Sequence, residues 1–423
     1  MEFQTKLLHG KAVDNYANGS TVPPVSLANA FAYESSEQLE KVFQNRAPGF
    51  AYTRIANPTV DAFERRVNEL EGGIGGVACS SGMSAVTLSL LNILQAGDEV
   101  IAGSALFGGT LDLLHDLEAF GIKVHFIPRV EKALIEPLLT DKTRAVFGEI
   151  VGNPALNVMD VRQTADFLHG KGVPLIVDST TSTPYLLNPI QYGADVVVHS
   201  TSKYINGSGD AISGIIIDSG NFDWDAYGHK YHGLTEPDES YHGVVYTKQF
   251  GKKAYITKAT TQLMRDLGSI PSPENCFLLN LGLETLPLRV ERHCENAQKV
   301  AEFLDAHEKV SHVIYAGLPN DKYHELAQKY MDKGRTCGVI SFELTGGRDA
   351  AVRFMDGLKL ANIATHVAAS KTMVLHPASH THRQMNDEQL REAGVSPGMI
   401  RLSVGIESAK DIINDLKEAL ENA

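Results

Sequence analysis

The feature that most constrains the fold is a regular alternation of short apolar runs and helical stretches between residues 77 and 217. The apolar runs lack a helical period and favour β-branched residues, which is typical of buried strands. They lie at 77–79, 99–102, 123–127, 143–148, 174–178, 195–199 and 212–217, and helices are predicted at 85–94, 110–120, 131–139 and 161–171. This pattern predicts an α/β fold, with a mainly parallel seven-stranded sheet covered by helices on both faces.

The sequence on either side of this region has a different character. Residues 1–60 have no strong period and contain several prolines, so we expect an N-terminal arm that contacts a neighbouring subunit. Residues 61–260 are expected to form the large domain, and residues 261–423 a smaller C-terminal α+β domain. Further helices are predicted at 61–70, 255–267, 278–303 (with Gly282 and Pro287 inside it as sources of a kink), 348–358 and 409–420, and further strands at 339–344 and 401–404.

Several polar or small residues follow directly after the predicted strands. Ligands of parallel sheets bind outside the carboxyl ends of the strands, so these residues are expected to share one edge of the sheet. They are Ser81, Gly82, Phe107, Asn153, Asp178 and Lys203. Their common position is harder to explain by chance than that of any one residue, and it predicts a ligand site at this edge.

Lys203 and Asp178 carry the most chemical information of this group. Lys203 follows the buried run Val196–Val198 and is flanked by Ser200 and Ser202, so it is either a nucleophilic amine beside an anion site or an ordinary surface lysine. Asp178 ends an apolar run, where a carboxylate needs a positive partner. A protonated pyridine nitrogen would be such a partner; a helix N-cap or a local salt bridge is the alternative.

Two stretches are suited to an anion such as phosphate. Ser80-Ser-Gly-Met-Ser84 lies between a strand and an apolar helix, where free backbone N–H groups point at a ligand, although an ordinary turn would look the same. Tyr52 and Arg54 are two residues apart, so their side chains point to the same side of an extended segment. They are either a phosphate contact or two exposed loop residues. The glycine run at 71–76 precedes its strand, which argues against a dinucleotide-binding motif.

The C-terminal part offers one anion-binding candidate and one histidine cluster. Arg401 opens a predicted strand, where it would face either an amino-acid carboxylate or an acidic side chain. His376, His380 and His382 are close in sequence, but only Asp387 lies near them as a further ligand. We therefore favour a structural or substrate-facing loop and expect no metal site.

Composition excludes several classes of protein. A net charge of −13 and the absence of a basic tract disfavour nucleic acid and anionic membranes as partners. No apolar run is long enough for a membrane helix, and the N-terminus has no signal-peptide pattern, so we expect a cytoplasmic protein. Its four cysteines, Cys79, Cys276, Cys294 and Cys337, lack metal-binding spacing and are expected to be reduced thiols.

In order and residue type, these motifs resemble the Cys/Met-metabolism pyridoxal-phosphate enzymes over nearly the whole chain. The motifs are Tyr52-Thr-Arg54-Ile-Ala-Asn-Pro-Thr, Ser80-Ser-Gly82-Met, Phe107-Gly-Gly-Thr, Asn153-Pro, Asp178 and Ser200-Thr-Ser202-Lys203. Gly-Leu-Glu-Thr-Leu at 282–286 and His-Pro-Ala-Ser at 376–379 are similar to the O-acetylhomoserine sulfhydrylase branch. The resemblance implies the aspartate-aminotransferase-like fold, called fold type I, in a homotetramer made of close dimers.

The resemblance also implies the roles of the site residues. Lys203 would bond to pyridoxal phosphate and then move protons between Cα, Cβ and the cofactor, and Asp178 would hold the pyridine nitrogen. The implied phosphate and ring contacts are Ser81, Gly82, Met83, Phe107, Asn153, Ser200 and Ser202, with Tyr52 and Arg54 reaching the neighbouring subunit's site. The implied substrate contacts are Arg401, for the carboxylate, Tyr52 and His366.

Three positions depart from the family pattern. Phe107 stands where a tyrosine usually stacks on the pyridine ring, so stacking is kept and a phenol that could move a proton is lost. Ser202 replaces a usual threonine, and Thr365–Ser370 differs from the usual Gly-Asp-rich segment near the carboxylate. Gly109 stands where methionine γ-lyases typically carry cysteine, which argues against that activity.

The activity implied by the resemblance is γ-replacement in methionine biosynthesis, in which O-acetylhomoserine and sulfide give homocysteine and acetate. Cystathionine γ-synthase and γ-lyase activities on the same scaffold are the near alternatives. A cofactor-binding protein with weakened catalysis is a further alternative, motivated by Phe107, against which the intact Lys203, Asp178 and Arg401 argue.

Overall fold

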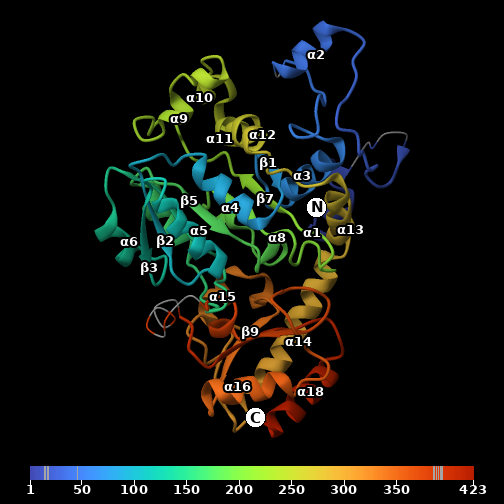
Figure 1. Ribbon diagram of the computed structural model, residues 1–423, viewed down its shortest axis with the longest axis vertical. Coiled ribbons are helices and arrows are strands. Elements are labelled where there is room, and N and C mark those ends of the chain that lie inside the picture. The colour runs from blue at the N-terminus through green and yellow to red at the C-terminus, as the bar shows by residue number, and fades with distance from the viewer. Residues whose placement is uncertain are drawn as a thin grey trace.

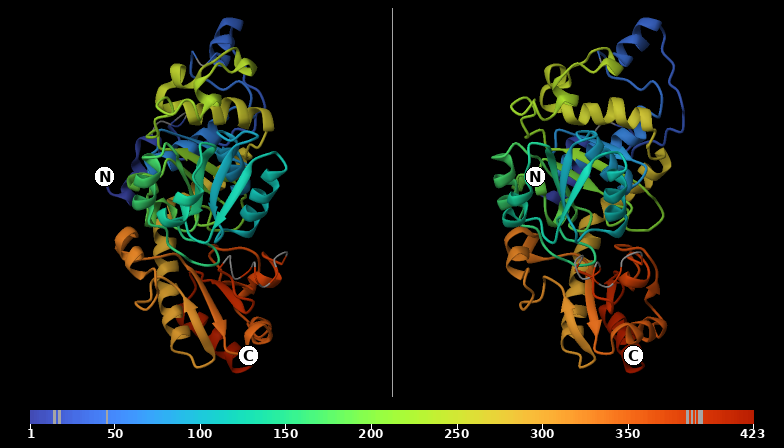
Figure 2. Two further views of the ribbon diagram at one scale, coloured as in Figure 1. Left: turned by 90° about the vertical axis from the view of Figure 1, so that its left-hand side faces the viewer. Right: turned by 60° about the vertical axis from the view of Figure 1, so that its left-hand side comes forward.

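The computed structural model describes residues 1–13, 16, 19–44, 46–383, 386, 388, 390 and 394–423. This part of the chain forms two lobes, the larger built on a seven-stranded sheet and the smaller on a five-stranded sheet (Figure 1). The side views place the C-terminus in the smaller lobe and the N-terminus beside the larger one (Figure 2). No helix in these described ranges is long and apolar enough to cross a membrane.

The large sheet confirms the predicted strand pattern. Its order is β1-β7-β6-β5-β4-β2-β3, and every pair from β6 to β3 is parallel. Strand β7 is the exception, because it runs antiparallel to both of its neighbours. The strands are β1 Gly75–Cys79, β2 Glu99–Gly103, β3 Lys123–Ile127, β4 Thr143–Glu149, β5 Leu175–Asp178, β6 Val196–His199 and β7 Gly214–Asp218.

Both faces of this sheet are buried, which explains why its strands are apolar without alternation. In β6, Val197 packs into one apolar cluster, whereas Val196 and Val198 pack into another. The helices of this lobe are α3 Pro58–Glu71, α4 Gly82–Leu91, α5 Gly108–Glu118, α6 Lys132–Ile135, α7 Val161–His169, α8 Thr183–Leu186, α9 His232–Thr235, α10 Tyr246–Phe250, α11 Ala254–Lys258 and α12 Arg265–Leu267. Helices α3 and α4 begin three residues before their predicted starts, because Asn57 and Ser81 cap their first turns.

Two consecutive helices connect the lobes. The predicted helix at 278–303 is two helices, α13 Pro273–Glu284 and α14 Leu286–Asp305, which separate at Thr285, shortly before Pro287. Helix α13 packs on α3 of the larger lobe, and α14 packs on the smaller sheet. Arg289 stabilises the junction between α13 and α14, because its guanidinium donates to the main-chain oxygens of Tyr204 at 2.6 Å and Gly282 at 2.5 Å.

The smaller lobe has the predicted α+β character. Its sheet has the order β10-β11-β12-β9-β8, and β12 is antiparallel to both β11 and β9. The strands are β8 Val310–Ile314, β9 Val339–Leu344, β10 Asn362–Ile363, β11 Met373–Leu375 and β12 Met399–Ser403, and the helices are α15 His324–Tyr330, α16 Gly347–Asp356 and α18 Ala409–Glu421.

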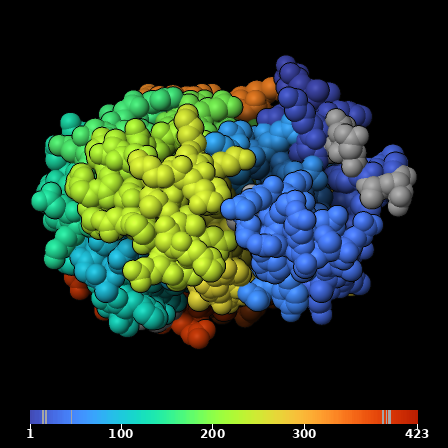
Figure 3. Space-filling view, turned by 90° about the horizontal axis from the view of Figure 1, so that it is seen from above, coloured from blue at the N-terminus to red at the C-terminus, as the bar shows by residue number. Residues whose placement is uncertain are grey.

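The N-terminal region has two parts with different packing. Helix α1, Phe3–His9, buries Leu7 and packs on α3 and α13. Helix α2, Ser36–Phe43, has no buried residue and projects from the larger lobe (Figure 1). From above, the segment that carries α2 lies beside the segment around residues 240–265 (Figure 3).

Asp218 at the end of β7 should make stability depend on pH. Burial raises the pKa of Asp218 to about 7, and nearby Asp195 adds to the effect. The folded protein therefore holds a proton that the unfolded chain releases, so stability is full below about pH 4 and falls, by up to about 1.4 kcal/mol per pH unit, as pH rises to about 7. We expect Asp218→Asn to raise the melting temperature relative to the wild type by more at pH 8 than at pH 4.5. An equal difference at both pH values would contradict this assignment.

Candidate active site

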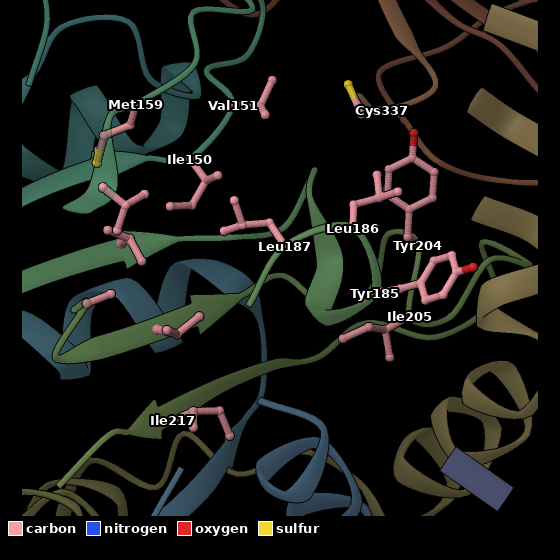
Figure 4. Close-up of a cluster of buried hydrophobic side chains, with 14 of the residues drawn as sticks. Ile150, Val151, Met159, Tyr185, Leu186, Leu187, Tyr204, Ile205, Ile217 and Cys337 are labelled. Carbon is pink, nitrogen blue, oxygen red and sulfur yellow. The ribbon is translucent and has the colours of Figure 1, made fainter. Parts of the chain in front are cut away.

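Lys203 is held by a rigid segment that follows β6. The main-chain N–H of Gly207 donates to the main-chain oxygen of Lys203 at 2.8 Å, which closes a tight turn. The next two residues, Tyr204 and Ile205, are buried in the core of the larger lobe (Figure 4). Burial and the Arg401 guanidinium lower the pKa of Lys203 to about 8, against the opposing effect of Asp178. The amine is therefore much easier to deprotonate than that of a surface lysine.

A cavity of about 370 Å³ lies in front of this amine. Every residue proposed from the sequence lines it, except Tyr52 and Arg54. The lining comes from strand ends and loops of the larger lobe and from two segments of the smaller lobe, so the site lies where the lobes meet. The lining residues are Ser81, Gly82, Met83, Val86, Phe107, Thr110, Glu149, Asn153, Asp178, Thr180, Thr181, Ser200, Ser202, Lys203, Gly209, Ala211, Ile212, Thr365, His366, Val367 and Arg401.

One end of the cavity is built to hold an anion. Helix α4 begins at Gly82, and Ser81 caps it by accepting from the N–H of Ser84 at 3.1 Å. A Cβ at Gly82 would lie 2.5 Å from the Cβ of Ser200, so only glycine lets the two segments approach this closely. The helix N-terminus and the Ser200 hydroxyl therefore meet at one place, which suits a phosphate group. The Ser202 hydroxyl, by contrast, exchanges hydrogen bonds with the main chain of Ser213 at 3.1 Å.

Asp178 presents its carboxylate to the same cavity from the end of β5. Its Oδ1 accepts from the main-chain N–H of Thr180 at 2.8 Å. This contact within the loop resembles the helix N-cap that was the alternative role for Asp178. No Lys or Arg of the described chain forms an ion pair with it, so the salt-bridge alternative has no partner there. Burial raises the pKa of Asp178, while hydrogen bonds from Thr180 and the charge of Lys203 act in the opposite direction. A cationic ligand atom would complete this site.

Glu149 is a site residue that sequence reasoning missed. It ends β4 beside Asp178 of β5 in the sheet register, and it is buried. Its two oxygens accept from the N–H groups of Phe107, at 2.7 Å, and Asn153, at 2.9 Å. Burial and the adjacent Asp178 raise the pKa of Glu149. The signal was present, because Glu149 ends a strand just as Asp178 does.

We expect Glu149→Gln to loosen the cavity wall. An amide has one acceptor oxygen, so either Phe107 or Asn153 would lose its partner inside the protein, at a cost of about 1–3 kcal/mol. The measurable result is weaker binding of pyridoxal phosphate, together with a lower melting temperature. Glu99→Gln is the matched control, since Glu99 begins β2 at the opposite edge of the sheet. Equal losses of cofactor affinity in the two variants would contradict a local role for Glu149.

Arg401 lies on β12 of the smaller lobe and is 3% exposed. It donates to Asn153 Oδ1 at 3.3 Å and to the main-chain oxygen of His366 at 3.4 Å, while its Nε has no partner among the described atoms. Burial lowers the pKa of Arg401 to about 10, which leaves it charged at neutral pH. Its described hydrogen-bond partners are Asn153 and the main chain of His366, and neither is acidic, which favours the ligand-carboxylate interpretation over a salt bridge.

Phe107 caps α5 and is 38% exposed at the cavity. A Cβ at Gly109 would lie 2.8 Å from the Phe107 ring, so the glycine leaves space for that ring. Phe107 is thus available to pack on a flat ligand, as the stacking prediction requires.

Tyr52 and Arg54 lie outside the cavity. Tyr52 is 42% exposed, and the Arg54 guanidinium lies 5.5 Å from the centre of its ring. Arg54 also donates to the main-chain oxygen of Arg265. Their predicted phosphate contact therefore stays a prediction that requires a second subunit.

The histidine cluster has structural partners. His376 bonds to the Ser379 hydroxyl at 2.7 Å and to the main-chain oxygen of Pro397 at 2.9 Å. The His382 ring is buried and bonds to the Thr381 hydroxyl. Asp387 lies outside the described residues. Within the described ranges, no three His, Cys, Asp or Glu side chains converge as metal ligands would.

The cavity fits pyridoxal phosphate on structural grounds. The start of α4 at Gly82 offers main-chain N–H groups to a phosphate. Asp178 has no cationic partner among the described residues, and a pyridinium would supply one. The Lys203 amine lines the same cavity. Phe107 offers a flat face for the ring. These groups come from separate strand ends, so the sheet itself sets their spacing.

Comparisons with known proteins show the family to which the chain belongs. The family model of the Cys/Met-metabolism PLP-dependent enzymes matches residues 4–421. The chain is 42% identical to the O-acetyl-L-homoserine sulfhydrylase of Leptospira meyeri, over 99% of this chain and 96% of that protein. It is 40% identical to the homocysteine synthase of Schizosaccharomyces pombe, over 100% and 98%. A Campylobacter jejuni structure described as an O-acetylhomoserine (thiol)-lyase, which contains N'-pyridoxyl-lysine-5'-monophosphate, has a TM-score of 0.96 and 35% identity, with full coverage of both chains.

Proposed function

Since this chain belongs to the Cys/Met-metabolism pyridoxal-phosphate-dependent enzymes, which have the fold type I architecture, we propose that it makes homocysteine and acetate from O-acetylhomoserine and sulfide. The observation that carries this proposal is that the half-buried amine of Lys203 and the guanidinium of Arg401, whose Nε has no partner among the described atoms, line one cavity. An amino acid whose carboxylate binds Arg401 has its reacting carbons beside Lys203.

Some of the cavity residues bind the cofactor or the substrate, and Lys203 transfers protons. Bound pyridoxal phosphate supplies an electron sink for charge that develops on the substrate carbons. Asp178 holds the proton on the pyridine nitrogen, and Lys203 Nζ removes and returns protons at Cα and Cβ. The N–H groups of Gly82 and Met83 and the hydroxyl of Ser200 hold the phosphate, and Ser81, Asn153 and Phe107 complete the cofactor contacts. Ser202, which the resemblance also implied as a phosphate contact, lines the same cavity with its hydroxyl bonded to Ser213. Arg401 orients the amino acid by its carboxylate.

The charges of the cavity favour a neutral acyl group and a small nucleophile. Among the described lining residues, Lys203 and Arg401 are the basic side chains, and both are assigned to the reaction itself. An O-succinyl group, or cysteine as the nucleophile, would bring an additional carboxylate toward Glu149 and Asp178 without a cation to pair it. This supports acetyl transfer with sulfide over cystathionine γ-synthase activity.

The test offers O-acetylhomoserine to the purified protein with sulfide, with cysteine and with no nucleophile. Homocysteine formed with sulfide alone is the expected result. Cystathionine formed at a comparable rate with cysteine would support the synthase alternative, and oxobutyrate formed without a nucleophile would support a γ-lyase. Turnover of O-succinylhomoserine at the same rate as the acetyl ester would contradict the charge argument.

We further propose a cytoplasmic homotetramer of close dimers, with domains at 61–260 and 261–423 and residues 1–60 as an arm. The fully unburied helix α2 and the exposed Tyr52 support an arm that contacts another subunit. In this assembly Tyr52 and Arg54 reach the partner's phosphate, and Tyr52 also borders the substrate. The four cysteines are free and buried, which suits a reducing compartment.

This assembly predicts complementation between two inactive variants. Arg54→Ala should leave Lys203 intact but deprive the neighbouring site of its phosphate contact, whereas Lys203→Ala should retain Arg54. If subunits pair at random after mixed refolding, about half of the dimers contain one subunit of each variant. One of the two sites in such a dimer is intact, so about a quarter of all sites should be restored. Activity no greater than the sum of the separate variants would contradict a shared site.

A further inference from the structure

His366 connects the two lobes at the Lys203 amine. It comes from the loop between β10 and β11 of the smaller lobe, and it lines the cavity. Its Nδ1 lies 3.2 Å from Lys203 Nζ, which is a side chain of the larger lobe. An ammonium group can only donate, so when Lys203 is protonated Nδ1 is the acceptor in this pair, and the proton of a neutral ring is on Nε2.

The loop that carries His366 is held firmly. The N–H of Ala368 donates to the Ser403 hydroxyl at 2.8 Å, and the N–H of Ser370 donates to the main-chain oxygen of Gly207 at 2.9 Å. Ala368 has a φ of 66°, an uncommon conformation for a residue with a side chain. The ring position relative to Lys203 is therefore set by contacts to both lobes.

The second ring nitrogen points to a missing ligand. Nε2 of His366 is buried, and it has no hydrogen-bond partner among the described atoms. It lies close to Gly209, another lining residue, since a Cβ there would be 3.8 Å away. A buried donor without a partner is costly, and a ligand that fills the cavity with an acceptor oxygen would remove this cost.

The surroundings keep the ring neutral. The charged groups that face it are Lys203 and Arg401, whose guanidinium also donates to the His366 main-chain oxygen. Burial, Lys203 and Arg401 lower the pKa of His366 to about 4, so the ring stays an acceptor on one side and a donor on the other at neutral pH. No tyrosine of the described chain lines the cavity, and it is the His366 ring that lies within hydrogen-bond distance of Lys203 Nζ.

We propose that His366 is a two-sided contact of the active site, in which Nδ1 positions the Lys203 amine and Nε2–H donates to an oxygen of the substrate's acyl ester. This assignment rests on the proposed function for the identity of the ester. It makes His366 a positioning residue for Lys203 and a specificity residue for an oxygen-linked leaving group.

Two variants separate these contacts. His366→Asn keeps an acceptor at the place of Nδ1 and loses the group at Nε2, whereas His366→Gln can place a donor near Nε2 and loses the acceptor at Nδ1. The first measurement is the pH profile of pyridoxal phosphate attachment to the apoprotein, trapped on Lys203 with borohydride. The second compares the KM for O-acetylhomoserine with the inhibition constant of norvaline, which has a similar chain but no ester oxygen.

Each variant should change one of the two measurements and leave the other unchanged. In His366→Asn, we expect KM for O-acetylhomoserine to rise about tenfold, because one buried hydrogen bond is lost, while norvaline inhibition and the attachment profile stay unchanged. In His366→Gln, we expect the apparent pKa of attachment to fall, because the ammonium form of Lys203 loses its acceptor, while the preference for the ester over norvaline is kept.

A merely structural role would change both measurements in the same direction in both variants, and this outcome would overturn the proposal. Unchanged values in both variants, or a rise in the apparent pKa in His366→Gln, would also overturn it. If the wild-type protein does not turn over O-acetylhomoserine, the proposed function and the ester contact fail together. The attachment profile would still decide the contact with Lys203, so the two failures remain distinguishable.

Discussion

Lys203→Ala should yield a protein that borohydride does not couple to the cofactor, with at least roughly 10⁴-fold lower activity, because the amine serves both as the covalent anchor and as the proton carrier. Wild-type protein reconstituted with pyridoxal phosphate should be yellow, and borohydride should fix the cofactor to the peptide that contains Lys203. The variant should bind the cofactor only non-covalently, through the contacts around Gly82 and Asp178. Absorbance and peptide mass analysis measure both results.

Lys258 is a matched control for this experiment. It is also buried, and burial lowers the pKa of Lys258 to about 8, as for Lys203. Its Nζ donates to the main-chain oxygen of Asn92 at 2.7 Å, at the end of α4 and outside the cavity. Lys258→Met should therefore lower the melting temperature but leave the colour and the borohydride product intact. A cofactor fixed to Lys258, or to Lys203→Ala protein, would refute the assignment of the reactive amine.

Asp178→Asn should lower the turnover number by roughly 10²–10⁴-fold with a smaller change in cofactor affinity. A carboxylate stabilises a protonated pyridine nitrogen, and a neutral amide does not, so the electron sink would weaken while the phosphate contacts remain. Steady-state kinetics and a cofactor titration separate the two effects.

Asp218→Asn is the corresponding control, because Asp218, like Asp178, is an aspartate at the end of a strand of the same sheet. Strand β7 is antiparallel to its neighbours, so Asp218 lies at the edge of the sheet opposite to Asp178. Its substitution should change the pH dependence of stability and leave turnover unchanged. A comparable loss of turnover in both variants would mean that the effect of Asp178→Asn is structural.

Much of the site could be predicted because its residues follow strand ends. A buried strand is recognisable from a short run such as Val196–Val198, and the residue after it necessarily lies at the edge of the sheet. Lys203, Asp178 and Gly82 were found in this way, and all three line the cavity. Glu149 obeys the same rule and was missed, since its two main-chain partners, Phe107 and Asn153, are recognisable only in the folded chain.

Other features depend on contacts between distant segments. The approach of His366 to Lys203 joins residues 163 positions apart, and no local pattern encodes it. Thr180 was missed for a similar reason: its hydroxyl accepts from the N–H of Ser200 at 2.8 Å, while its main-chain N–H donates to Asp178 Oδ1 at 2.8 Å. The division of the predicted helix at 278–303 was signalled by Pro287, but the direction of α14 into the smaller lobe is set by packing.

The sequence by itself determined the α/β architecture and predicted Lys203 as the reactive lysine and Gly82 as part of an anion site, because strand pattern, glycine and helix start are local properties of the chain. Only the tertiary structure decided which strand-end acids share the cavity, because strand direction depends on pairing partners. It placed Asp178 and Glu149 at the cavity and Asp218 at the opposite edge. It also brought Arg401 and His366 from the smaller lobe to Lys203, which local sequence cannot specify since the approach depends on how two separately built sheets pack together.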